Sequence, residues 1–97
     1  MKQILSNINF DTKGKGFTDI TKDINVWIKN KKLKQGILLI FLKHTSCSLI
    51  INENADNNVL KDLSNYMEAI VPERNFFPID RTNRKIEYLH SEEGLDD

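Results

Sequence analysis

Apolar and polar residues alternate at the start of the chain. Ile4, Ile8 and Phe10 share one parity within 2–10, which is typical of a half-buried strand. The next segment, 11–16, places two glycines among polar residues and has the chemistry of a turn. We therefore predict a strand over 2–10 that ends in a turn.

Two later segments carry apolar residues at helical spacing instead. Thr21 is expected to cap the first helix and Gly36 to stop it. The apolar positions of the first helix are Ile20, Ile24, Trp27 and Ile28. Asp56 is expected to cap the second helix, and Pro72 ends it. The apolar positions of the second helix are Val59, Leu60, Leu63, Met67 and Ile70.

The segment between the helices is the most apolar part of the chain. Residues 36–44 read GILLIFLKH and are apolar on both parities, which indicates a strand that is covered on both faces and forms the core. Residues 48–52 resume as a strand that suits an antiparallel neighbour, and 85–89 is a further strand candidate. This order of elements favours a single α+β domain over 1–97.

Composition narrows the range of partners. Lys plus Arg and Asp plus Glu both number 14, so the net charge is zero and no global attraction to nucleic acid is expected. The basic stretch 29–34 is explained by solvation of a helix C-terminus. The longest apolar run, 37–42, is far shorter than the roughly 20 residues of a membrane span. A signal peptide is not recognisable and Cys47 is the single cysteine, so we expect a cytoplasmic protein without nucleic-acid or membrane partners.

The clearest cluster of reactive groups follows the central strand. His44 is succeeded by Thr45, Ser46 and Ser48, so an imidazole and three hydroxyls leave the core together and can bind an anion or a metal. A strand-end turn held by local side-chain hydrogen bonds explains the same residues, and spacing alone favours that interpretation. Cys47 has the opposite parity to His44, which argues against a catalytic dyad and for a small buried hydrophobe.

A second polar cluster spans 52–56 before the second helix. Capping explains Asp56, but Glu53 is in phase with Leu49 and Ile51 and would lie on their apolar face. A carboxylate buried there would have to be paired or bound to a metal. A functional role and a structural role for Glu53 both stay open.

The second histidine lies near the end of the sequence. His90 begins an H-x-E fragment like that of zinc deaminases, but the P-C-x-x-C partner motif is absent, so that class is excluded. The acidic residues of 92–97 are typical of a solvated tail. From the residues alone, the sequence suggests the hypothesis of a metal or phosphate site around His44, Glu53 and His90.

Three motifs in the chain carry a family resemblance. An H-T-S strand exit begins at His44, an N-E-N-A-D segment at Asn52 and a Y-x-H-x-E-G-x-D-D segment at Tyr88. In this order they resemble the YjbQ-like family, also called the secondary thiamine-phosphate synthase family. The resemblance covers essentially the whole chain.

The resemblance implies a mixed or antiparallel barrel-like sheet with two helices packed outside it, assembled as a homotrimer. It also implies thiamine-phosphate synthase activity, which joins an aminopyrimidine pyrophosphate to a thiazole phosphate and releases pyrophosphate with the help of Mg²⁺ or Zn²⁺. By position, His44 and Glu53 would be catalytic, and His44 and His90 would bind the metal. The residues that bind the small phosphorylated substrate would be Thr45, Ser46, Asn52, Asn54 and Asp56.

The chain departs from the family pattern at one point. Family members continue beyond the D-D segment with an H-x-K stretch and further strands. We therefore expect a C-terminally truncated or split member without its closing strands. The alternative function is a non-enzymatic remnant, or an oligomeric module that binds metal or phosphate without turnover.

Overall fold

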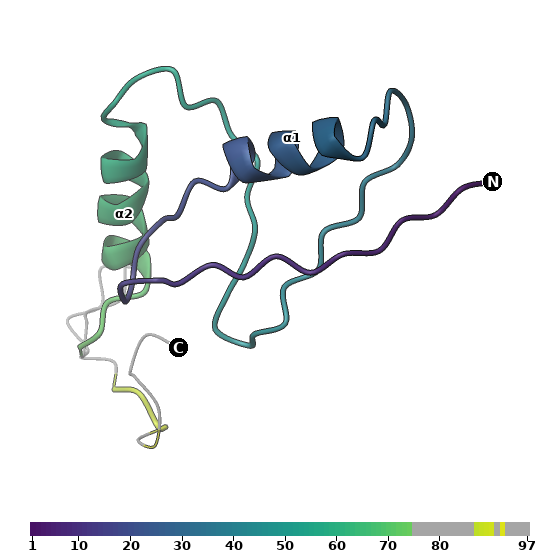
Figure 1. Cartoon of the computed structure of the whole chain (residues 1–97). Helices are drawn as coiled ribbons and strands as arrows, with labels where there is room; N and C mark the ends of the chain where they lie inside the picture. The colour runs from purple at the N-terminus through teal and green to yellow at the C-terminus, as the bar shows by residue number, and fades with distance from the viewer. Residues whose placement is uncertain (75–86, 91, 93–97) are drawn as a thin grey trace. The chain divides into compact units, whose positions relative to one another are not determined.

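The protein contains two helices in the part of the chain that the structure describes. The computed structural model describes residues 1–74, 87–90 and 92. Helix α1 comprises Thr21–Asn30 and helix α2 comprises Val59–Ile70 (Figure 1). The chain divides into two compact units, Met1–Gly36 with α1 and Ile37–Asp97 with α2. Both predicted helices are confirmed.

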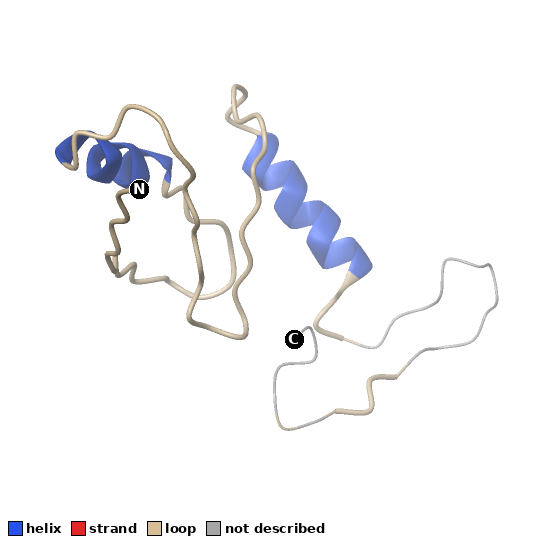
Figure 2. Ribbon diagram, turned by 90° about the vertical axis from the view of Figure 1, so that its right-hand side faces the viewer, coloured by secondary structure: helices blue, strands red, loops and turns tan. Residues whose placement is uncertain are grey.

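The predicted strands do not form in the described residues. Segments 2–10, 36–44 and 48–52 are loops, as are the described residues of 85–89, whose first two residues lie outside the described part (Figure 2). The α+β fold with a barrel-like sheet is therefore wrong for the part of the chain that the structure describes. A β-strand is defined by backbone hydrogen bonds to a neighbouring strand. An apolar sequence pattern shows that a segment could join a sheet, but it does not show that a neighbouring strand is present.

The central apolar segment is exposed and is not a core. Residues Ile37, Leu39 and Phe41 lie open to solvent, and no large apolar side chain in the described residues is fully buried. The half-buried apolar residues belong mainly to the helices. In α1 they are Ile24, Trp27 and Ile28, as the helical spacing predicted.

Helix α1 begins differently from the prediction. The N-cap is Ile20, and Thr21 makes no side-chain capping bond. Instead, the backbone N–H of Thr21 donates to Asp19 Oδ1 over 3.0 Å. The carboxylate two residues ahead thus satisfies one of the N–H groups that a helix start leaves without an intrahelical acceptor.

Helix α1 ends well before Gly36, the residue expected to stop it. Lys32 adopts a left-handed φ of 55°. Its N–H donates to the Lys29 carbonyl over 3.0 Å, and the N–H of Leu33 donates to the Ile28 carbonyl over 3.3 Å. These two bonds form a Schellman motif, in which the residue at the Lys32 position is usually glycine.

Helix α2 starts and stops close to the predicted positions. Its N-cap is Asn58, whose N–H donates to Asp56 Oδ1 over 2.8 Å, so Asp56 acts two residues before the cap. The helix is followed by Val71 with φ −132° and ψ 69°, outside the helical region as expected for a residue before proline. Pro72 therefore ends the helix, as predicted. Neither α1 nor α2, the helices found in the described residues, is long and apolar enough to span a membrane.

We expect Lys32→Gly to stabilise α1 by about 1 kcal/mol, because glycine enters the left-handed region without the steric cost of a Cβ. The measurement is the urea dependence of far-ultraviolet circular dichroism. Lys31→Gly is the matched control, since it removes the same side chain at φ −82° and should destabilise the helix by up to about 1 kcal/mol. Effects of the same sign at both positions would contradict this explanation.

Candidate functional site

The His44 imidazole closes the turn that follows the central apolar segment. The backbone N–H of Ser46 donates to His44 Nδ1 over 3.0 Å. The lone pair of Nδ1 is thereby occupied, so the proton of the neutral ring lies on Nε2. The exposed ring therefore offers Nε2–H as a hydrogen-bond donor beside the exposed hydroxyls of Thr45 and Ser46.

A surface depression adjoins this turn and adds a cation to it. Its lining residues are Phe41, Leu42, Lys43, His44 and Thr45. Lys43 was missed in the sequence analysis, although its place directly before His44 is a readable signal. The depression thus combines an ammonium group, an imidazole N–H and a hydroxyl, and none of the described carboxylates lines it. Such a set of donors suits an anion with several acceptor oxygens.

The segment that carries Glu53 is a polar loop in the structure. Glu53 is exposed, and the face that it was expected to share is open, since Ile51 is fully exposed. The expectation of a carboxylate on a buried apolar face is therefore wrong. Asn52 Nδ2 donates to the backbone carbonyl of Glu53 over 2.9 Å, and Asn54 is exposed. In the described part of the chain, no hydrogen bond joins this segment to the His44 turn, so its role in a pocket stays a prediction.

His90 is associated with the end of α2 through a neighbouring tyrosine. The Tyr88 hydroxyl donates to the carbonyl of Pro72 over 2.7 Å. The Tyr88 and His90 ring centroids lie 5.5 Å apart at an interplanar angle of 54°. Tyr88 is the first residue of the motif Y-x-H, and the sequence alone assigned it no role. Cys47, which was expected to be buried, is exposed.

The described residues do not fit a bound divalent metal. Among them, no three His, Cys, Asp or Glu side chains lie close enough together to hold an ion. For His44 to bind a metal through Nε2, its proton would have to move to Nδ1, where it would face the Ser46 N–H. The expectation that this is a metal-binding protein is therefore corrected. The separate role of His90 stays a prediction, because part of its surroundings lies outside the described residues.

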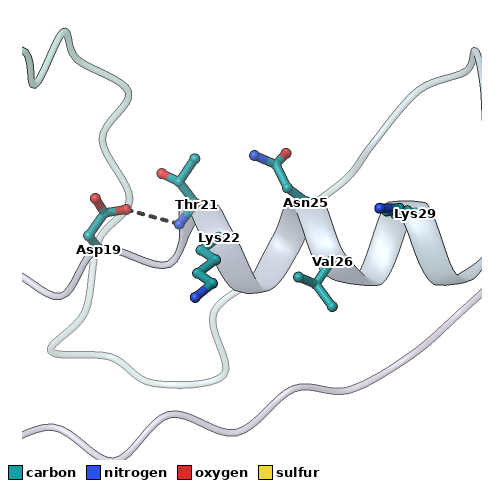
Figure 3. A pocket seen from close by; sticks show the side chains of 6 residues that line it. All are labelled: Asp19, Thr21, Lys22, Asn25, Val26 and Lys29. Carbon is teal, nitrogen blue, oxygen red and sulfur yellow. Dashed lines mark hydrogen bonds between the residues drawn. The ribbon is translucent and has the colours of Figure 1, made fainter.

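A second depression lies along α1 (Figure 3). Its lining residues are Asp19, Thr21, Lys22, Asn25, Val26 and Lys29. The hydrogen bond from the Thr21 backbone N–H, followed by the one from its side chain, lowers the pKa of Asp19. Asp19 is fully solvent-exposed, so its ionised form is stabilised by these bonds and not by a buried partner.

Comparison with known proteins identifies relatives over most of the chain. The family described as UPF0047 protein YjbQ-like matches residues 6–97. The UPF0047 protein sll1880 of Synechocystis is 40% identical over 86 residues, which cover 89% of this chain and 52% of the relative. The UPF0047 protein YugU of Bacillus subtilis is 33% identical over 61 residues, or 63% of this chain and 46% of the relative. The UPF0047 protein YjbQ of Salmonella typhimurium is 32% identical over 91 residues, which cover 93% of this chain and 58% of the relative.

The chain spans about half the length of the curated relatives it matches. No solved structure matches it. The family resemblance carried by the three motifs is confirmed. Thiamine-phosphate synthase activity is not: the relatives are named only as UPF0047 proteins, and nothing in the matches indicates a transferase or a role in thiamine biosynthesis. That assignment is corrected, while the expected truncation stays a prediction.

The start of α1 should be sensitive to acid because of Asp19. The pKa of Asp19 is lower in the folded state than its unfolded value of about 3.9, so the ionised carboxylate stabilises the folded state above that pH. This stabilisation is lost as the pH falls through the pKa of the folded state. We therefore expect the helical circular dichroism of α1 to be constant down to about pH 4 and to decrease below it. Asp19→Asn should remove this component, whereas Asp11→Asn should leave it in place. An unchanged acid transition in Asp19→Asn would refute the role of Asp19.

Proposed function

This chain belongs to the YjbQ-like UPF0047 family, and we propose that it binds a small phosphorylated molecule at the turn formed by His44, Thr45 and Ser46. The hydrogen bond from the Ser46 N–H to His44 Nδ1 is the observation that carries this proposal. It orders the turn before any ligand arrives and assigns the donor proton to Nε2. An ordered turn loses less conformational entropy on binding than a mobile one does.

The charge at the turn supports a phosphate group over a neutral ligand. Lys43 contributes a positive charge to the depression and Thr45 a hydroxyl, and the exposed hydroxyl of Ser46 follows next in the chain. A phosphate monoester has about two negative charges near neutral pH and three terminal oxygens that accept hydrogen bonds.

We also propose that the chain assembles as a homotrimer. The exposed apolar side of α2 supports contacts between copies, since Tyr66, Met67 and Ile70 all remain accessible on it. These side chains recur at helical spacing, so they present one continuous apolar surface. The cytoplasmic location inferred from the sequence remains a prediction.

Inorganic phosphate should shift the amide resonances of residues 43–46 in a saturable way in nuclear magnetic resonance titrations. Lys43→Ala should weaken this binding about fivefold, because a partly screened ion pair to a phosphate is worth about 1 kcal/mol. Lys61→Ala removes the same charge from the exposed side of α2 and is the control. Equal weakening by both variants would show that phosphate responds only to overall charge, and that would refute the proposed site.

The homotrimer should have a mass of three times 11.3 kDa in light scattering coupled to size exclusion. Met67→Lys should lower that mass, because it places a charge in the apolar surface of α2. Asn65→Lys, at an exposed polar position of the same helix, adds the same single charge and is the control. A mass of 11.3 kDa for the unaltered chain at high concentration would contradict this assembly.

A further inference from the structure

The net charge of zero is divided unequally between the two compact units of the chain. Met1–Gly36 contains eight lysines, no arginine and three acidic residues, which gives a formal charge of +5. Of the 14 basic and 14 acidic side chains in all, the other unit therefore has six and 11, which gives −5. The expectation that the chain is not attracted to nucleic acid rested on the sum of these charges. The first unit by itself has the excess of lysine that is typical of proteins that bind polyanions.

Half of the lysines of the first unit follow one another closely at the C-terminal end of α1. All four are exposed, and we call them the lysine patch: Lys29, Lys31, Lys32 and Lys34. No Asp or Glu occurs in the sequence between Asp23 and Glu53. The lysine patch therefore has no acidic neighbour along the chain to offset its charge.

Solvation of the helix C-terminus explains only one lysine of the patch. A cation stabilises the carbonyl end of a helix within its last turn, and the effect falls off beyond it. Lys29 is the basic residue of the last turn of α1, whereas Lys31 is the C-cap and the other two lysines lie beyond it. The Schellman motif already supplies backbone N–H groups to the carbonyls of Ile28 and Lys29. The end of α1 therefore does not account for the rest of the patch.

The depression along α1 extends the lysine patch towards the start of the helix (Figure 3). Lys29 and Lys22 both line it, together with the side-chain amide of Asn25. These three residues recur at helical spacing, so their donors share one side of α1. Asp19 also lines the depression, and its carboxylate accepts the backbone N–H of Thr21. An anion is therefore expected at the Lys29 end of the depression and not at the Asp19 end.

The composition of this side of α1 suits a nucleic acid better than a protein or a membrane. Among the residues that line the depression, only Val26 is apolar. Protein–protein interfaces have an apolar centre and are poor in lysine, whereas interfaces with nucleic acid are more polar and strongly positive. A helix that binds to a membrane surface inserts an open apolar face. The apolar stripe of α1 is half-buried instead: Ile24, Trp27 and Ile28.

We propose that the lysine patch binds the phosphate backbone of double-stranded nucleic acid without reading its sequence. Lysine contacts a phosphate as a point charge and lacks the planar fork with which arginine recognises a base edge. Proteins that bind single strands stack the bases on aromatic side chains. On α1 the aromatic residue is Trp27, which is half-buried with its Nε1 atom enclosed. A duplex needs no such stacking, and it presents phosphates at a higher density than a single strand does.

Fluorescence anisotropy of the full 97-residue chain with a labelled duplex of about 20 base pairs tests this proposal. Four phosphate contacts should weaken binding about 50-fold between about 50 and 150 mM NaCl, because each contact releases condensed counterions. DNA and RNA duplexes of one sequence should bind within about threefold of each other, since only the backbone is contacted. A single strand, or poly-L-glutamate of equal charge, that competes as well as the duplex would overturn the proposal, as would a lack of binding at the lower salt concentration.

The double variant Lys29→Gln with Lys31→Gln should weaken duplex binding by at least about tenfold and reduce the slope of log affinity against log salt by about two. Lys2→Gln with Lys13→Gln removes the same charge from the same unit and is the control, which should keep the slope. Circular dichroism of both variants verifies that α1 persists.

Nuclear magnetic resonance of the unaltered chain locates the contact. The duplex should shift the amide resonances of residues 29–34. Shifts in residues 43–46 without shifts in 29–34 would place the phosphates at the His44 turn and would overturn the proposal. Equal weakening by the two double variants would also overturn it, because binding would then follow overall charge alone.

Discussion

The source of backbone hydrogen bonds decides which parts of this chain are ordered by themselves. A helix satisfies its N–H and C=O groups within one segment, whereas a strand depends on a neighbour. Helices α1 and α2 therefore form from 10 and 12 local residues, while the most apolar segment, 37–42, stays a loop. The high exposure of apolar side chains in the described residues follows from the same constraint, because these residues form no sheet that the helices could cover.

Local chemistry governs the candidate site as well. The bonds from Ser46 to His44 and from Asn58 to Asp56 each span two residues. The hydrogen bond from the Tyr88 hydroxyl to the Pro72 carbonyl is less local, since it spans 16 residues. It brings the start of the Y-x-H motif to the end of α2. The site thus consists of turns that are ordered separately, and among its described residues Lys43, His44 and Thr45 share one depression.

The sequence allowed the helices to be predicted because their signals are local. The apolar spacing of α1 and the proline after α2 both lie within or next to the element that they define. The exact ends were less predictable: Asp19 acts on a backbone N–H two residues later, and the left-handed residue at the end of α1 is a lysine instead of a glycine. The strands could not be predicted reliably, because their existence depends on a partner that periodicity does not reveal. Glu53 was misplaced for this reason, since its apolar face presumed a sheet. The local turn at His44 was the favoured interpretation, and the structure has one, although the imidazole and not a hydroxyl makes the bond.

The exposure of residues 37–42 also bears on how the protein behaves in concentrated solution. Its formal net charge is zero and its isoelectric point is about 6.7, so near neutral pH the molecules have little long-range repulsion to keep them apart. Six consecutive apolar residues with β-forming side chains are a template for ordered stacking under such conditions. Lys34 and Lys43 then have the role of gatekeepers, since they are the charges nearest to the segment on either side. These two lysines, and the distance of the solution pH from the isoelectric point, thus provide the charge that opposes such stacking at this segment.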